Sequence, residues 1–145
     1  MRQLTSVLII DDSRADNLIH TRWLHRSGVV ASRSDVLTQP NGREALRFLK
    51  QWAAEPAAAG KPFPPELILL DINMPLMDGF EFLDALQDTI DTERLSSTVL
   101  LMLSSSSASR DRERAAQYPI VRGYITKPLV GAMISQIMDE HFREP

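Results

Sequence analysis

Residues 67–79 decide the fold, and they read Leu67-Ile68-Leu69-Leu70-Asp71-Ile72-Asn73-Met74-Pro75-Leu76-Met77-Asp78-Gly79. Four consecutive apolar residues without polar alternation are typical of a strand that is buried on both faces, as in a parallel sheet. The run ends at Asp71, and apolar residues recur at helical spacing after Asp78-Gly79. The stretch therefore predicts a buried strand, a loop that starts at a carboxylate, and a helix.

The same order of elements recurs along the whole chain. Apolar runs at 7–10, 99–103 and 120–125 predict three further buried strands, and a weaker strand is expected near Ser34–Thr38. Helical patterns follow these strands and begin near Ala15, Asn41, Asp78, Arg110 and Val130. Five strand–helix units imply right-handed crossovers and helices on both faces of the sheet. We predict an α/β fold with a doubly wound, five-stranded parallel sheet of the flavodoxin-like (βα)5 class.

The first helical pattern carries an apolar stripe at Ala15, Leu18, Ile19 and Trp23. This spacing is typical of a helix with one apolar face. His20 belongs to the same helix, and we expect it at the surface or at an interface.

The composition narrows the class of protein. A chain of 145 residues with 43% hydrophobic and 24% charged residues is typical of one ordinary globular domain. The absence of cysteine excludes disulfides, thiolate zinc sites and a cysteine nucleophile. A net charge of −3 argues against a nucleic-acid partner, and the apolar runs are too short to cross a membrane. We therefore expect a cytoplasmic protein that binds neither nucleic acid nor membrane.

Conspicuous polar residues follow four of the expected strands. Ligands of parallel α/β sheets bind at the carboxyl ends of the strands, where we expect Asp11, Asp12, Asp71, Ser104 and Lys127 to meet. Three carboxylates repel one another, and a hard cation such as Mg²⁺ relieves that repulsion. A lysine and a hydroxyl suit phosphoryl oxygens, and a carboxylate can accept a phosphoryl group. The sequence predicts Mg²⁺-dependent phosphoryl transfer, with Asp71 on the central strand as the acceptor.

Three segments resemble the signatures of the receiver domain of two-component response regulators: Leu8–Ser13, Asp71–Gly79 and Tyr124–Leu129. Their order matches that family, and the resemblance covers essentially the whole chain. It implies a stand-alone, CheY-like receiver over residues 1–145 with no output domain. Such a receiver takes a phosphoryl group from a sensor histidine kinase and switches a protein–protein contact surface. It catalyses its own phosphorylation and dephosphorylation and is no enzyme toward other substrates.

The resemblance also assigns roles at the site. Asp71 is then the phosphoacceptor, and Lys127 pairs with the phosphoryl group. The metal ligands implied are Asp12 directly, Asp11 largely through water, Asp71, and the backbone carbonyl of Asn73.

Two further residues are implied as the switch that responds to phosphorylation. Ser104 is the hydroxyl expected to move to the phosphoryl group, and Tyr124 is the aromatic expected to change rotamer. Because serine occupies 104–107, Ser105 stays open as an alternative to Ser104.

Other segments of the sequence indicate the partners of the chain. The Pro-rich segment Ala53–Pro65, the serine run and the Ile125–Leu129 ending are similar to stand-alone regulators that serve bacterial phytochromes, so a phytochrome-type kinase is expected. A homodimer through the fourth helix, fifth strand and fifth helix is compatible with the sequence. Relay to a histidine phosphotransfer protein, as an intermediate receiver in a multistep phosphorelay, is equally compatible.

Two other functions compete with this interpretation. A small Mg²⁺-dependent aspartate-nucleophile phosphatase needs a general acid two residues after the nucleophile, and that position is Asn73, which cannot serve as one. A pseudo-receiver without chemistry is disfavoured because the carboxylates, the hydroxyl and the lysine are all present.

Overall fold

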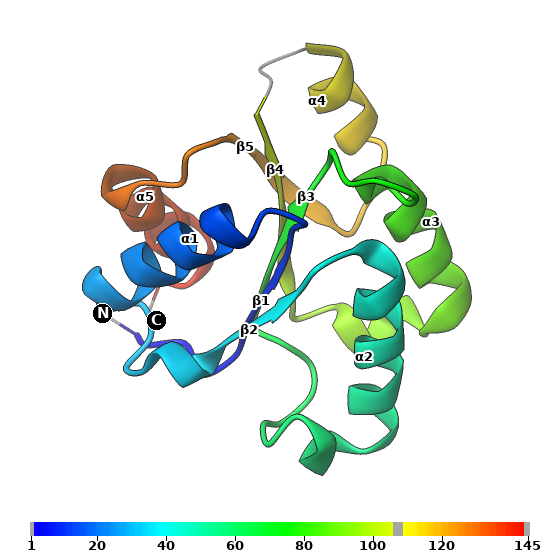
Figure 1. Ribbon diagram of the computed structural model, residues 1–145, viewed down its shortest axis with the longest axis horizontal. Helices are drawn as coiled ribbons and strands as arrows, with labels where there is room; N and C mark the ends of the chain where they lie inside the picture. The colour runs from blue at the N-terminus through cyan, green and yellow to red at the C-terminus, as the bar shows by residue number, and fades with distance from the viewer. Residues whose placement is uncertain (1, 106–108, 144–145) are drawn as a thin grey trace.

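Five parallel strands form one sheet in the order β2-β1-β3-β4-β5 (Figure 1). The computed structural model describes residues 2–105 and 109–143, so Ser106 and Ser107 of the serine run lie outside the described residues. The strands are β1 Val7–Ile10, β2 Val36–Gln39, β3 Leu67–Asp71, β4 Val99–Ser104 and β5 Val121–Thr126. Every residue of β1, β3 and β4 is buried, as their unbroken apolar runs predict. The predicted doubly wound sheet is confirmed.

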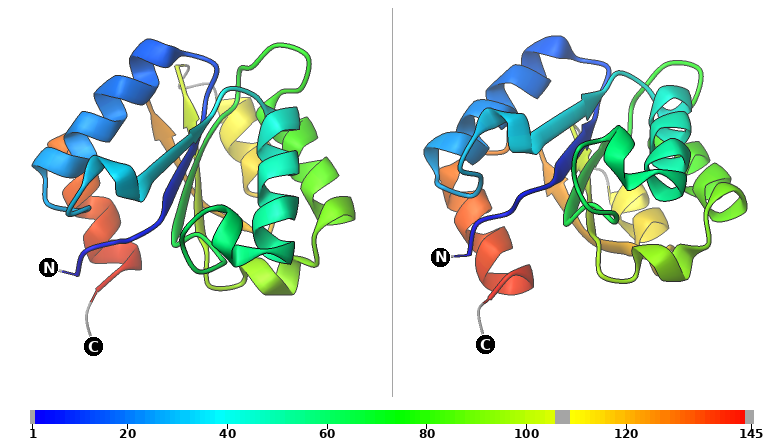
Figure 2. Two further views of the ribbon diagram at one scale, coloured as in Figure 1. Left: turned by 60° about the horizontal axis from the view of Figure 1, so that its bottom comes forward. Right: turned by 90° about the horizontal axis from the view of Figure 1, so that it is seen from below.

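Helices cover both faces of the sheet (Figure 2). One face carries α1 Arg14–Arg26 and α5 Gly131–His141, which pack with β-strand residues into one apolar cluster. The other face carries α2 Gly42–Ala54, α3 Gly79–Thr89 and α4 Ser109–Ala115, which share a second cluster. The loops that lead from the carboxyl ends of β1, β3 and β5 into α1, α3 and α5 all lie at one end of the sheet. No helix within the described residues is both long and apolar enough to span a bilayer.

Short polar residues fix where these helices begin. The Ser13 hydroxyl accepts a hydrogen bond from the Asp16 backbone N–H at 3.1 Å and caps α1. Asp78 and Glu81 form a reciprocal capping box at the start of α3, with distances of 2.8 and 3.1 Å. α1 therefore begins two residues after Asp12, and α3 begins at the end of the loop that follows Asp71.

The second strand begins two residues later than expected. Ser32 accepts a hydrogen bond from the Ser34 backbone N–H at 3.2 Å, and its own N–H donates to the Asp35 carboxylate at 3.2 Å. These local bonds close a 3₁₀ turn at Arg33–Asp35, because short polar side chains compete with strand hydrogen bonding. The strand is then free to begin only at Val36.

The apolar stripe of α1 does not face the sheet. Leu18 is 53% exposed, Ile19 is 45% exposed and Trp23 is 37% exposed, whereas the buried residues of α1 are His20 and Leu24. The expectation of a surface His20 is therefore wrong. The residue is 1% exposed, and its Nε2 accepts a hydrogen bond from the Leu129 backbone N–H at 3.4 Å.

Candidate functional site

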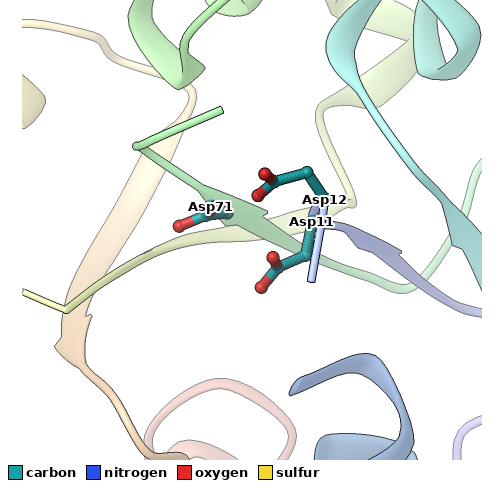
Figure 3. A group of neighbouring side chains, drawn as sticks. All are labelled: Asp11, Asp12 and Asp71. Atoms are coloured by element: carbon teal, nitrogen blue, oxygen red, sulfur yellow. The ribbon is translucent and has the colours of Figure 1, made fainter. Parts of the chain in front are cut away.

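The carboxyl ends of β1 and β3 bring the three predicted carboxylates together. Parallel pairing places Ile10 beside Leu70, so Asp11 and Asp71 follow on neighbouring strands. Figure 3 shows the side chains of Asp11, Asp12 and Asp71 gathered at these two strand ends. One oxygen from each carboxylate lies within 4.8 Å of the others. The predicted convergence of these carboxylates is therefore present.

Burial makes this cluster electrostatically costly. Asp11 is 0% exposed and Asp71 is 3% exposed, while Asp12 is exposed to solvent. Desolvation, followed by repulsion from Asp11, raises the pKa of Asp71 to about 6, against the opposing effects of Lys127 and the Asn73 backbone N–H. A cation beside Asp71 would favour its charged form. Closely spaced carboxylate oxygens, one of them open to solvent, suit a hard divalent ion such as Mg²⁺, and receiver domains typically bind Mg²⁺ at such an acidic site.

Lys127 lies against the same carboxylates. Its Nζ is 2.8 Å from Asp11 Oδ2 and 3.3 Å from Asp71 Oδ1, and the side chain is 13% exposed. Its backbone N–H donates to the Ser104 carbonyl at 2.7 Å, which ties the end of β5 to the end of β4. Desolvation opposes the charged ammonium, but hydrogen bonds with the carboxylates outweigh it and raise the pKa of Lys127. The ammonium is therefore charged at neutral pH and lies beside Asp71.

Asp16 also belongs to this group and is not among the site residues predicted from the sequence. Its Oδ2 lies 2.9 Å from Lys127 Nζ. The hydrogen bond from Lys127 is the main cause that lowers the pKa of Asp16. The available signal was its place in the first turn of a helix that Ser13 caps directly after Asp12.

The two residues expected to act as a switch lie on β4 and β5. Ser104 ends β4, is 0% exposed and pairs with Thr126, whereas Ser105 is exposed. Tyr124 pairs with Met102 across the strands, and the Arg112 guanidinium lies 5.0 Å from its ring centroid. The switching roles of Ser104 and Tyr124 stay predictions.

The loop after Asp71 is held by a close backbone approach. A Cβ on Gly79 would lie 2.8 Å from the Asp71 carbonyl oxygen and 3.0 Å from Ile72 Cα. The Gly79 N–H donates to the Ile72 carbonyl at 2.8 Å. Only glycine fits this contact, which brings the start of α3 against the end of β3.

Leu76, at the tip of this loop, has a left-handed backbone with φ of 70° and a fully exposed side chain. A Cβ in this region costs about 1 kcal/mol or more. Leu76→Gly removes this strain, but glycine also has more conformational entropy in the unfolded chain, which offsets part of the gain. We therefore expect Leu76→Gly to raise the free energy of unfolding by about 0.5 kcal/mol. Urea denaturation measures the change. Leu76→Ala keeps the Cβ and is expected to give no gain, so equal stabilities of the two variants would contradict the strain.

Comparisons with known proteins agree with this geometry. The family model described as response regulator receiver domain matches residues 7–139. The sensor histidine kinase CheAY of Helicobacter pylori is 30% identical over 132 residues, which are 91% of this chain but 14% of that kinase. A two-component response regulator from Cytophaga hutchinsonii superposes with a TM-score of 0.84 at 26% identity, covering 99% of this chain and 100% of that one.

A more distant structure shares the fold. The bacteriophytochrome response regulator RtBRR has a TM-score of 0.74 at 23% identity, covering 99% of this chain and 81% of that one. The family match spans both strand ends that carry the carboxylates, as well as Lys127. The chain belongs to the response regulator receiver domain family of two-component signalling, whose partners are histidine kinases.

Proposed function

We propose that this chain accepts a phosphoryl group from a sensor histidine kinase onto Asp71 and thereby switches a protein–protein contact. One observation carries the proposal: the Asp71 carboxylate lies beside Asp11, Asp12 and the Lys127 ammonium at the carboxyl ends of the strands. In this proposal residues 1–145 form one receiver domain, and it acts in the cytoplasm.

The proposed transfer uses groups that the site already contains. An oxygen of Asp71 forms a bond to phosphorus while the phosphorus–nitrogen bond of the phosphohistidine breaks, and its electron pair stays on the imidazole. Lys127, 3.3 Å from Asp71 Oδ1, stabilises negative charge on the phosphoryl oxygens. Mg²⁺ would be held by Asp11, Asp12, Asp71 and the Asn73 carbonyl, and would neutralise further charge.

The proposed output is the face formed by α4, β5 and α5. Phosphorylation adds negative charge at Asp71, and the Ser104 hydroxyl and the Tyr124 ring carry the response to this face. A groove of about 280 Å³ lies on it, lined by residues such as Arg112, Tyr124, Gln136 and Glu140. Its mixture of positive and negative charge suits a homodimer of this chain.

The proposed donor is a phytochrome-type kinase. Its support is the fold shared with the bacteriophytochrome response regulator RtBRR together with the Pro-rich segment 53–65. Onward relay to a histidine phosphotransfer protein uses the same acyl phosphate, and phosphotransfer profiling against both protein classes separates these partners.

Incubation with acetyl phosphate tests the acceptor function directly. With Mg²⁺, intact-mass spectrometry is expected to show the mass of one added phosphoryl group, and with EDTA the gain is expected to fall at least tenfold, because the carboxylates then repel the donor. No mass gain with Mg²⁺ would contradict the proposal. Continuous hydrolysis of small phosphate esters would instead support the phosphatase, which Asn73 disfavours because an amide cannot act as general acid.

A further inference from the structure

Lys127 makes more contacts than phosphoryl binding alone requires. An ammonium has three N–H donors, and three carboxylate oxygens lie near Lys127 Nζ. Asp11 Oδ2 is at 2.8 Å, Asp16 Oδ2 is at 2.9 Å and Asp71 Oδ1 is at 3.3 Å. The two short contacts come from the side chains that stay carboxylates when Asp71 is phosphorylated. The longest contact is the one to the phosphoacceptor.

The two short contacts come from independent parts of the fold. Asp11 follows β1 and is fully buried, and its Oδ1 accepts the Ser13 backbone N–H at 2.9 Å. Asp16 lies on the first turn of α1, whose position is set by the Ser13 cap. A strand end and a helix end therefore hold one ammonium between them. A flexible lysine side chain loses rotamer freedom when it is fixed in one position. A second hydrogen-bond acceptor offsets part of that cost.

We propose that Asp16 is a positioning residue: with Asp11 it fixes the Lys127 ammonium so that the remaining N–H points at Asp71 and at the phosphoryl group transferred there. This proposal rests on the function proposed above. Asp16 does not touch the phosphoryl group and acts only through Lys127. The role needs an oxygen acceptor at residue 16 rather than a negative charge, so Asp16→Asn keeps it and Asp16→Ala removes it.

A double-mutant cycle tests whether Asp16 acts through Lys127. The measured rate is phosphorylation by acetyl phosphate with Mg²⁺, followed by intact mass. Asp16→Ala is expected to slow the rate about fivefold, which is the effect of losing one partly exposed charge-assisted hydrogen bond, and Asp16→Asn is expected to stay within about twofold of the original chain. In the Lys127→Ala background, Asp16→Ala is expected to change nothing further. Equal slowing in both backgrounds, or equal slowing by Asn and Ala, would overturn the proposal.

A second measurement needs neither phosphorylation nor a Lys127 variant. The chain has three lysines, Lys50, Lys61 and Lys127, so NMR of chain labelled with ¹⁵N-lysine gives a simple spectrum. The Lys127 Nζ protons are expected to exchange slowly with water in the original chain and in Asp16→Asn, and at least fivefold faster in Asp16→Ala. Lys61, paired with Asp35 at 2.8 Å, is the internal control.

The two measurements separate the proposals. Failure of the original chain to take up phosphate would overturn the acceptor function and leave the exchange rates to decide the role of Asp16. Normal phosphorylation with an unchanged Lys127 exchange rate in Asp16→Ala would overturn the positioning role alone.

Discussion

Lys127→Ala is expected to lower the free energy of unfolding of the metal-free chain by about 3 kcal/mol at neutral pH, because it leaves buried carboxylates without their cation. Asp11 is fully buried and Asp71 is 3% exposed, and both lose an ammonium contact. The loss is expected to shrink as the pH falls below about 6, where the carboxyl group of Asp71 gains a proton. Added Mg²⁺ is also expected to restore part of the stability.

Urea denaturation in EDTA measures this effect, and Lys61→Ala is the matched control. Lys61 also makes an ion pair, 2.8 Å from Asp35, but this pair lies outside the carboxylate cluster and its side chains are 16% and 18% exposed. Lys61→Ala leaves one partly exposed carboxylate, whereas Lys127→Ala leaves two buried ones, so the loss for Lys61→Ala is expected to be about 1 kcal/mol or less. Equal losses of unfolding free energy in the two variants would show that the Lys127 charge does not stabilise the carboxylates around it.

Asp71→Asn is expected to raise the free energy of unfolding of the metal-free chain by about 2 kcal/mol at neutral pH. The pKa of Asp71 is about 6 in the folded chain, against 3.8 for an ordinary aspartate. The folded chain therefore binds the Asp71 proton more tightly than the unfolded chain does. Between pH 4 and 6 the contribution of Asp71 to the free energy of unfolding therefore falls as the pH rises. An amide does not ionise and escapes this loss, while it forgoes part of the attraction to Lys127.

The pH dependence of unfolding separates this explanation from a general change in packing. In EDTA, the original chain and Asp71→Asn are expected to converge in stability near pH 4 and to differ most above pH 6. Asp88→Asn, the same substitution at an exposed position of α3, is expected to change stability by less than about 0.5 kcal/mol. An Asp71→Asn variant that is less stable than the original chain at neutral pH would contradict a costly buried charge.

The strand ends were predictable because their signals lie in contiguous sequence. Apolar runs without alternation identify strands buried on both faces, and the residue that ends each run is placed by the sheet itself. This rule predicts the positions of Asp11, Asp71 and Lys127, because parallel pairing brings the ends of their strands together. The role of Asp78 as the cap of α3 was also predictable, because a helix cap depends on residues only three positions apart.

The inward face of α1 was not predictable from hydrophobic spacing. Its buried face contains His20 and Leu24, and Asp16 precedes His20 by one turn. Asp16 and His20 contact the loop of Lys127 and Leu129, whereas Leu24 packs into the apolar cluster of the sheet face. Because α1 borders the carboxylate cluster, part of its buried face is polar, and hydrophobic spacing does not predict such a face. Hydrophobic spacing alone would place Leu18, Ile19 and Trp23 on the buried face of α1, but all three are exposed.

The most direct test of the central claim is phosphoryl uptake by Asp71→Asn beside Asp88→Asn. Each variant is incubated with acetyl phosphate and Mg²⁺, and its intact mass is compared with that of the original chain. The original chain and Asp88→Asn are expected to gain one phosphoryl group, and Asp71→Asn is expected to gain none, because an amide oxygen is a poor nucleophile. A folded Asp71→Asn that takes up a phosphoryl group with the hydrolytic lability of the original would contradict the assignment of Asp71 as the acceptor.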